Sequence, residues 1–158
     1  MPDGNMDTTF TDEKDERFLN LVRELDRGYY KRIGDELSKY DSYNEFKNPH
    51  VVILAFDNNI VVACASYRIF DNDSVEFKRV YVKKEYRKRG IAYNLIIQLE
   101  KSVIESGFKY SYIVTGKNNQ PAIKLYKKLN YELIDNFGQF KCDDTVICMK
   151  KEFTPCFE

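Results

Sequence analysis

The sequence lacks tryptophan and contains a single histidine, His50. One histidine cannot form a multi-histidine metal site, and it argues against Ser-His-Asp and Cys-His hydrolases. The four cysteines include no C-x-x-C pair: Cys64, Cys142, Cys148 and Cys156. A zinc site from the last three cysteines and His50 is conceivable, but the usual short ligand spacing is missing. We therefore expect free thiols and no metal.

Long apolar runs and net charge are also absent. The longest apolar stretches, such as Val51 to Phe56, are far shorter than the roughly 20 residues that cross a bilayer. Met1 to Thr9 is polar and lacks the apolar segment of a secretion signal, so we expect a cytoplasmic protein with no membrane partner. The 25 basic and 25 acidic residues cancel, which argues against nucleic acid as the main partner.

Length and composition favour one globular domain. The 158 residues, of which 43% are hydrophobic, suffice for one sizeable core. No linker rich in glycine, serine or proline and no internal repeat divides the chain. We expect a flexible N-terminus over residues 1–10, a single domain over residues 11–153 and a short tail over residues 154–158.

The N-terminal part of the chain predicts helix. Thr11 or Asp12 can cap a first helix. Four apolar side chains then recur at steps of four, three and four residues, which places them in one stripe: Phe18, Val22, Leu25 and Tyr29. The mixed, charged segment that follows predicts a short helix over Asp35 to Tyr40 and then a loop.

From His50 onward the pattern favours strands that alternate with helices. Two apolar runs, His50 to Phe56 and Ile60 to Phe70, flank a turn and predict a β-hairpin. We then expect, in chain order, a strand over 75–82, a helix over 91–106, a strand over 108–115, a helix over 120–129 and strands near 131–134 and 145–153. A strand–helix–strand unit requires a parallel crossover, whereas hairpins are antiparallel. The predicted class is therefore a mixed α/β (α+β) sheet with helices on both faces.

A basic segment after the third predicted strand is the first candidate site. Five of the seven residues from Lys83 to Arg89 are basic, and Gly90 opens the following helix. The free N–H groups of a helix N-terminus suit a diphosphate, and glycine lets the backbone approach it. A solvated basic loop with a capping glycine explains these residues equally well. A nucleic-acid patch would need interleaved aromatic side chains, and the G-x-x-x-x-G-K-[ST] phosphate loop is absent.

The segment Asn119 to Tyr131 is the second candidate site. Pro121 suits the first turn of a helix, on which one face carries Ala122, Leu125, Tyr126 and Leu129. Taken alone, Tyr126 is better explained as an amphipathic core residue, because the chain contains 12 tyrosines.

Together the two segments resemble the GNAT superfamily of acyl-CoA-dependent N-acetyltransferases. The family's phosphate loop, Arg/Gln-x-x-Gly-x-Gly/Ala, is matched by Arg87, Gly90 and Ala92. Its later motif, Asn-x-x-Ala-x-x-Leu-Tyr-x-x-x-Gly-Phe/Tyr, is matched by Asn119, Ala122, Leu125, Tyr126 and Tyr131. Asn130 replaces the glycine, and asparagine also tolerates a left-handed backbone. Weaker similarity to an uncharacterised bacterial group extends the resemblance to about residues 15–153. The resemblance implies a mostly antiparallel sheet with a central parallel strand pair.

The resemblance implies a binding site for acetyl-CoA. In the family the pantetheine arm pairs with the end of the third predicted strand, because its amides replace a missing strand neighbour. The N–H of Val80 would then polarise the thioester carbonyl, and amides of the basic turn would bind the pyrophosphate. The implied coenzyme-binding residues are Val80, Tyr81, Val82, Arg87, Lys88, Arg89, Gly90, Ile91, Ala92 and Asn119.

The resemblance also implies two catalytic residues. Attack on a thioester requires a neutral amine, so a base must accept a proton. Glu76 occupies the strand position at which several family members keep a glutamate base, and a charge in a buried strand is costly unless it is paired. An ion pair with Lys78 or Arg79 explains Glu76 equally well. Tyr126 is the family's usual acid for the departing thiolate.

The implied function is transfer of an acetyl group from acetyl-CoA to a primary amine of a small molecule, amino acid or protein. The transfer would occur by direct attack in a ternary complex, without a metal. The alternative is a non-catalytic module that binds or senses acyl-CoA. A nucleic-acid partner such as aminoacyl-tRNA would show salt-dependent binding, and zero net charge weighs against it. The sequence leaves the acceptor, the acyl length and the oligomeric state open, a homodimer included.

Overall fold

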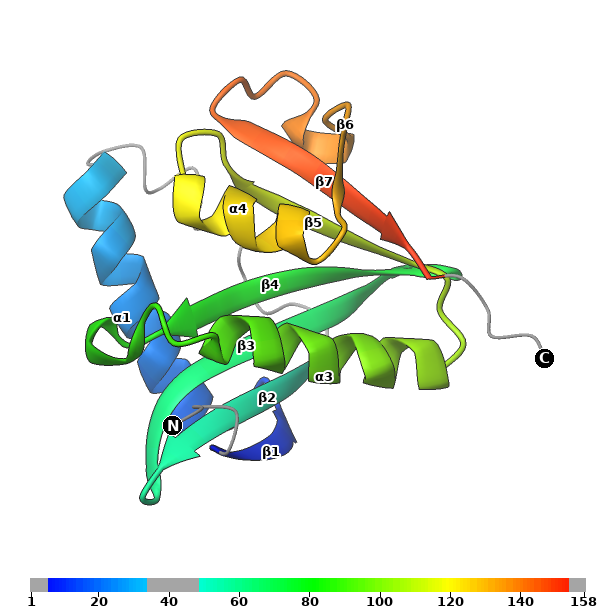
Figure 1. The fold of residues 1–158 in the computed structure, drawn as a ribbon. Coiled ribbons are helices and arrows are strands. Elements are labelled where there is room, and N and C mark those ends of the chain that lie inside the picture. Colours follow the sequence, from blue (N-terminus) through cyan, green and yellow to red (C-terminus); the bar gives the residue numbers. More distant parts are fainter. Residues whose placement is uncertain (1–5, 34–48, 154–158) are drawn as a thin grey trace. The chain divides into compact units, whose positions relative to one another are not determined.

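The computed structural model describes residues 6–33 and 49–153, and it describes residues 28–33 by their backbone alone (Figure 1). Within this part of the chain, one seven-stranded sheet has the order β1-β2-β3-β4-β5-β7-β6. The strands are β1 (Asp7–Asp12), β2 (His50–Asp57), β3 (Ile60–Asp71), β4 (Ser74–Val82), β5 (Tyr110–Gly116), β6 (Glu132–Ile134) and β7 (Val146–Glu152). The β4–β5 pair is parallel, and β1–β2, β2–β3, β5–β7 and β6–β7 are antiparallel. The predicted class, a mostly antiparallel mixed sheet with a central parallel pair, is confirmed.

The chain divides into two compact units. The first unit comprises residues 1–68 and 78–99, and the second comprises residues 69–77 and 100–158. Strand β4 and helix α3 (Ile91–Glu105) each contribute residues to both units. Of the coenzyme-binding residues inferred from the sequence, all except Asn119 belong to the first unit. Asn119 and the two inferred catalytic residues, Glu76 and Tyr126, belong to the second.

The N-terminus differs from the sequence prediction. Residues 7–12 form β1, which pairs along its whole length with β2, so the expectation of a flexible segment is wrong for residues 7–10. Phe10 is the one large apolar side chain of this strand, and 49% of it is exposed. A polar strand at a sheet edge needs backbone pairing and little burial, so the strand gives no apolar pattern in the sequence.

Helix α1 (Glu16–Ile33) also begins later than predicted. The carboxylate of Asp15 accepts a 2.8 Å hydrogen bond from the N–H of Arg17, and its carbonyl accepts one from the N–H of Leu19. Asp15 is therefore the N-terminal capping residue, in place of Thr11 or Asp12. The short helix expected over Asp35 to Tyr40 lies outside the described residues.

The predicted hairpin of β2 and β3 is present and carries the core of the first unit. Asn58 and Asn59 form its two-residue turn with φ values of 51° and 70°, as a type I′ turn requires. The hairpin and α1 share a buried cluster that comprises Phe18, Leu21, Val22, Val52, Leu54 and Cys64. Full burial of each large aliphatic or aromatic side chain contributes roughly 1.5–3 kcal/mol, so this cluster fixes α1 on the hairpin.

The second unit contains β5, β7, β6 and helix α4 (Gln120–Lys128), in addition to the first half of β4. Asn130, directly after the C-terminal cap of α4, has a φ of 73°. Asparagine thus takes the left-handed conformation that glycine would take there. Cys142 is exposed, whereas Cys64 and Cys148 are buried, and all three are free thiols. In residues 6–33 and 49–153 no helix is long and apolar enough to cross a membrane.

Candidate active site

The basic turn predicted to bind phosphate opens helix α3 in the first unit. A short 3₁₀ helix over Lys84–Tyr86 precedes this turn. Two residues of the turn have left-handed backbones: Lys88 with φ 66° and Gly90 with φ 81°. The carbonyl of Gly90 accepts the first bond of the helix, from the N–H of Asn94 at 3.1 Å. A side chain at Gly90 would meet no atom within 4 Å, so the space in front of the helix N-terminus is open. The start of α3 offers backbone N–H groups that have no partner within the helix. The first turn of α3 contains no acidic side chain that would repel an anion.

The arginines of this turn are held in place by neighbouring groups of the same unit. Arg87 donates from Nε to the carbonyl of Val82 at 2.8 Å, and its guanidinium lies 5.5 Å from the centre of the Tyr81 ring. Arg89 donates to the carbonyl of Glu85 at 3.1 Å and lies 5.0 Å from the Tyr86 ring. Each guanidinium lies near an aromatic ring and donates to a backbone carbonyl of the same unit. The loop is therefore a basic surface whose two arginines contact their own segment.

The backbone of β4 is irregular at Arg79, in the first unit. Arg79 has a φ of 58° inside the strand, and its Nη1 pairs with Oδ1 of Asp26 at 2.6 Å. Two side chains of β3 donate to β4 carbonyls here: the Ser66 hydroxyl to Lys78 at 2.7 Å and the Cys64 thiol to Arg79 at 3.4 Å. A left-handed residue interrupts the extended conformation of a strand, so Arg79 separates Val80–Val82 from the regular part of β4.

The parallel pairing of β4 with β5 is short. It covers four residue pairs, from Ser74 opposite Tyr110 to Phe77 opposite Ile113. The residues of β4 with the predicted coenzyme contacts, Val80, Tyr81 and Val82, follow this paired stretch. Tyr81 donates from its hydroxyl to Oε1 of Glu24 at 3.2 Å, and burial raises the pKa of Tyr81. Tyr81 therefore keeps its phenolic proton, and its ring lies next to the guanidinium of Arg87.

Glu76 lies in the paired half of β4, in the second unit, and only 2% of it is exposed. Residues of a strand alternate between its faces, and the neighbouring Phe77 packs on Tyr131 at a ring distance of 6.4 Å. Glu76 therefore faces the opposite side, which carries Cys148. Burial raises the pKa of the Cys148 thiol, and the charge of Glu76 adds to that effect. Arg79, one of the two cations considered as partners of Glu76, forms an ion pair with Asp26.

Aromatic rings adjoin Glu76 on the same strand row. Tyr112 is its register partner in β5. The Tyr112 ring lies 5.1 Å from Phe70 and 5.1 Å from Phe137, measured between ring centres. Phe70 is 37% exposed, and Tyr112 and Phe137 are half-buried. This face of the second unit therefore combines a buried carboxylate with partly accessible aromatic surface.

Tyr126 lies on α4 in the second unit and is buried. Its ring meets that of Tyr131 edge-on, with centres 6.0 Å apart. Asn119 caps the same helix, since its Oδ1 accepts a 3.3 Å hydrogen bond from the N–H of Ala122. The capping of α4 is by itself a sufficient reason for an asparagine at this position of the motif, without any role in binding the coenzyme. The structure thus places the predicted acid on a helix that is capped at its start and closed by a left-handed residue at its end.

A buried polar chain that the sequence analysis missed lies next to Tyr126. The hydroxyls of Ser111 and Tyr131 are 2.5 Å apart, and Tyr131 donates to Oε2 of Glu100 at 3.1 Å. Lys151 donates to Oε1 of the same carboxylate at 2.8 Å. Burial raises the pKa of Glu100 against the opposing effect of Lys151, and burial raises the pKa of Tyr131 well above its usual value. Tyr131 matched the family motif, but nothing in the sequence joined it to Ser111, Glu100 or Lys151.

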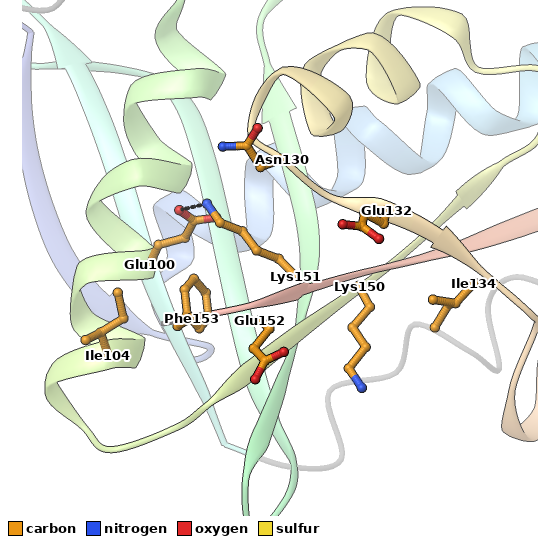
Figure 2. Close-up of a pocket in the computed structure, with 9 residues that line it drawn as sticks. All are labelled: Glu100, Ile104, Asn130, Glu132, Ile134, Lys150, Lys151, Glu152 and Phe153. Carbon is orange, nitrogen blue, oxygen red and sulfur yellow. Dashed lines mark hydrogen bonds and ion pairs between the residues drawn. The ribbon is translucent and has the colours of Figure 1, made fainter. Parts of the chain in front are cut away.

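A pocket of about 660 Å³ opens beside this chain of polar groups in the second unit (Figure 2). Figure 2 shows the Glu100–Lys151 pair at its wall, next to Phe153 and below Asn130. It is lined by Glu100, Ile104, Asn130, Glu132, Ile134, Lys150, Lys151, Glu152 and Phe153. None of the residues predicted to bind the coenzyme or to act in catalysis belongs to this lining. Among the described residues, no group of three or more His, Cys, Asp or Glu side chains could hold a metal ion.

Comparison with known proteins defines the class of the chain. The sequence profile of the acetyltransferase (GNAT) family matches residues 18–131, more than half of the chain. The protein therefore belongs to the GNAT acetyltransferase family. The family resemblance inferred from the two motifs is confirmed.

Individual relatives agree with this assignment. An acetyltransferase of Pectobacterium atrosepticum is 39% identical over 54 residues, which cover 34% of this chain and 38% of that protein. A protein of Klebsiella pneumoniae, regarded as an acyl-CoA N-acyltransferase, has a similar structure with a TM-score of 0.79. It is 19% identical, and the alignment covers 95% of this chain and 99% of that one. The PaiA N-acetyltransferase of Thermoplasma acidophilum, solved with coenzyme A, has a TM-score of 0.67 at 18% identity, over 92% and 99% of the two chains.

Proposed function

We propose that this protein transfers the acetyl group of acetyl-CoA to a primary amine, by direct attack of the amine in a ternary complex. The observation that carries the proposal is the open, left-handed turn of Lys88 and Gly90 at the N-terminus of α3. A diphosphate would suit this turn because a β-carbon at Gly90 would meet no atom within 4 Å, the helix N-terminus offers backbone N–H groups, and Arg87 and Arg89 add positive charge. Acetyl-CoA would supply the thioester. The residues of the chain would bind and orient the substrates and transfer the protons.

Backbone groups of the first unit would bind and orient the coenzyme. The residues from Arg87 to Ala92 would hold its diphosphate and the basic side chains its 3′-phosphate. Because Arg79 is left-handed and the pairing of β4 with β5 ends at Phe77, the backbone of Val80–Val82 is suited to an extended amide ligand. The N–H of Val80 would donate to the thioester carbonyl. Asn119 would contribute indirectly, by holding the start of α4.

Glu76 would act as the base that takes the proton from the attacking amine. Its burial supports this role, since it holds a proton acceptor away from bulk water and beside its register partner Tyr112. The rings of Phe70, Tyr112 and Phe137 suit the carbon skeleton of such an amine. The acceptor is thus proposed as a small molecule, amino acid or peptide with a primary amine, bound without nucleic acid or membrane.

Tyr126 would protonate the departing thiolate. Its place on a short, capped helix and its edge-on contact with Tyr131 restrict the ring to one position, as an acid that must meet a single sulfur atom requires. The free thiols are compatible with a reducing compartment, so the cytoplasm is the proposed location.

A screen of primary amines tests the proposal. Acetyl-CoA and the protein are incubated with each amine, and the release of free thiol is followed with and without a chelator. We expect amine-dependent release that the chelator leaves unchanged. Binding of coenzyme A in a calorimeter without thiol release for any amine would favour a sensing module instead. Absence of both binding and release would overturn the proposal.

A further inference from the structure

Tyr131 contacts Tyr126 in two ways. Its backbone N–H donates to the carbonyl of Tyr126 at 2.9 Å, which closes the last turn of α4. Its ring meets the ring of Tyr126 at an interplanar angle of 65° with centres 6.0 Å apart. The position of the Tyr126 ring along and across the helix therefore depends on where Tyr131 lies.

The hydroxyl of Tyr131 is fixed from two other elements. Ser111 of β5 lies on one side at 2.5 Å, and Glu100 of α3 lies on the other at 3.1 Å. All three residues are buried, with exposures of 0% for Ser111, 5% for Glu100 and 3% for Tyr131. A ring held at its far end by two hydrogen bonds has little freedom to tilt or slide. Tyr131 is thus attached to β5 and α3 at its hydroxyl and to α4 at its backbone.

The proton arrangement in this chain follows from its chemistry. A phenol has one proton, and the stronger acceptor is the Glu100 carboxylate, so Tyr131 donates to Glu100. Ser111 then donates to the phenol oxygen. Lys151 donates to the second oxygen of Glu100, and this contact opposes the effect of burial, which raises the pKa of Glu100. Every polar group of the chain from Ser111 to Lys151 therefore has a partner, as a buried network requires to be stable.

We propose that Tyr131, anchored by Ser111 and the Glu100–Lys151 pair, is a positioning residue that fixes the Tyr126 hydroxyl for catalysis. The proposal rests on the proposed function of Tyr126 as the general acid. It adds that the acid cannot be aligned by α4 alone, because that helix is only nine residues long and Tyr126 lies in its last turn. The ends of short helices fray unless a neighbour holds them.

A double-mutant cycle tests this proposal. Tyr131→Phe keeps the ring but removes the hydroxyl that Ser111 and Glu100 hold. With an amine from the screen, we expect kcat to fall about tenfold while the KM for acetyl-CoA stays unchanged, because misplacement affects the transition state. In a Tyr126→Phe background, the same substitution should have almost no further effect on kcat, because Tyr131 acts through Tyr126. Equal losses in both backgrounds would overturn the proposal.

Ser74→Ala provides the matched control. Like Tyr131, Ser74 is a buried residue of the second unit whose hydroxyl donates to a carboxylate, here Oδ1 of Asp71 at 2.7 Å. The control loses one such bond without touching α4, so we expect its kcat to stay within about twofold of the wild type. A tenfold loss in Ser74→Ala as well would show that kcat reports general stability and would overturn the proposal.

Hydrogen exchange supplies a measurement that needs no turnover. In Tyr131→Phe we expect faster exchange of the amides at the end of α4, namely Leu129, Asn130 and Tyr131, whose bonds hold the last turn. Amides of the α3 segment should keep their wild-type rates. Unchanged protection at the end of α4 would overturn the positioning role even where an amine is acetylated. If protection falls as expected but no amine is acetylated, the proposed function fails while the anchoring stands.

Discussion

The basic turn of the first unit and the buried chain of the second are built in opposite ways. The turn is exposed from Arg87 to Gly90, contiguous in sequence and defined by its backbone, with left-handed residues at Lys88 and Gly90. The chain from Ser111 to Lys151 is buried, scattered in sequence and defined by side chains. An exposed backbone site can tolerate changes at many side chains, whereas a buried side-chain network depends on each member. Binding and catalysis should therefore respond differently to substitution.

The largest effect is expected on the buried side, at Tyr126. Tyr126→Phe keeps the ring and its contact with Tyr131 but removes the acid. Loss of a general acid costs roughly 10²–10⁴-fold in rate, and it should appear in kcat with little change in coenzyme affinity. Steady-state kinetics with an amine from the screen measures it. Tyr67→Phe, at a buried tyrosine of the first unit, is the control. A Tyr126→Phe variant within about twofold of the wild type in kcat, when chemistry limits the rate, would make Tyr126 a core residue.

Lys151→Met should give the next largest effect, on stability. Lys151 is the charged partner of Glu100, and its loss leaves a buried carboxylate without a cation. Breaking a buried pair on one side costs about 3 kcal/mol or more, measured by urea unfolding at pH 7. Lys150→Met is the control, because the ammonium group of Lys150 lies over the rings of Tyr110 and Tyr112. An equal loss of stability in the two variants would show that Glu100 does not need Lys151.

The pH dependence of Lys151→Met sharpens this test. Burial raises the pKa of Glu100 above that of the unfolded chain, so in the folded state the ionised form is disfavoured. The unfolded state binds fewer protons between the two pKa values, and stability therefore falls as pH rises through that window. Without Lys151 the pKa of Glu100 in the folded state should rise further, which extends the pH window upward. The loss of unfolding free energy in the variant, relative to the wild type, should therefore become smaller as the pH is lowered from 7 toward 5. A deficit that does not depend on pH would mean that Glu100 is not the cause.

Substitution in the exposed turn should affect binding and leave the fold intact. Gly90→Asp places a carboxylate where a diphosphate is proposed to lie, and we expect a loss of coenzyme affinity of roughly a hundredfold from charge repulsion. Calorimetry measures it. Gly107→Asp is the control, because Gly107 has a similar φ of 90° and an equally open Cβ position. The control variant has a similar backbone strain at a position where no diphosphate is proposed to bind. Unchanged coenzyme affinity in Gly90→Asp, or an equal loss of affinity in both variants, would contradict the proposed site.

The smallest effect is expected at Asn130, whose left-handed backbone follows the C-terminal cap of α4. Asn130→Gly should change the free energy of unfolding by less than about 0.5 kcal/mol, since glycine adopts this conformation freely. Asn130→Ala should destabilise by about 1 kcal/mol, because a β-carbon is unfavourable at positive φ. Thermal unfolding of both variants measures the difference. Equal stability of the two would show that the backbone at residue 130 is not held in the left-handed region.

The contrast between the two regions also explains what the sequence could predict. The turn and the α4 motif are each contiguous, so glycine, proline and helical spacing were enough to place them. The left-handed backbone of Arg79 was not predicted, because an arginine at positive φ has no sequence signal of its own. The β1 strand was missed because its segment is polar apart from Phe10. A segment without a periodic pattern of apolar residues forms a strand only because it pairs with a neighbouring strand.

The buried chain could not be predicted for a different reason. Its hydrogen bonds join residues that are 20, 31 and 51 positions apart, from Ser111 to Tyr131, Tyr131 to Glu100 and Lys151 to Glu100. Each of these residues by itself fits an ordinary strand or helix pattern. Glu100 in particular lies in a helix with a strong apolar face, where a glutamate suggests solvent. Only the packing of α3, β5 and β7 within the second unit brings the four groups together.

The buried thiols have a consequence for the chemical durability of the protein. Desolvation raises the pKa of Cys64 to about 12 and also raises the pKa of Cys148. Oxidation and alkylation require the thiolate, so at neutral pH these two sulfur atoms should resist peroxide and iodoacetamide while the chain is folded. Among the described thiols, Cys142 is the exposed one and should react first. Among the thiols of residues 6–33 and 49–153, it therefore offers the attachment point for a fluorophore, on the β6–β7 connection and at a residue to which no part of the proposed chemistry is assigned.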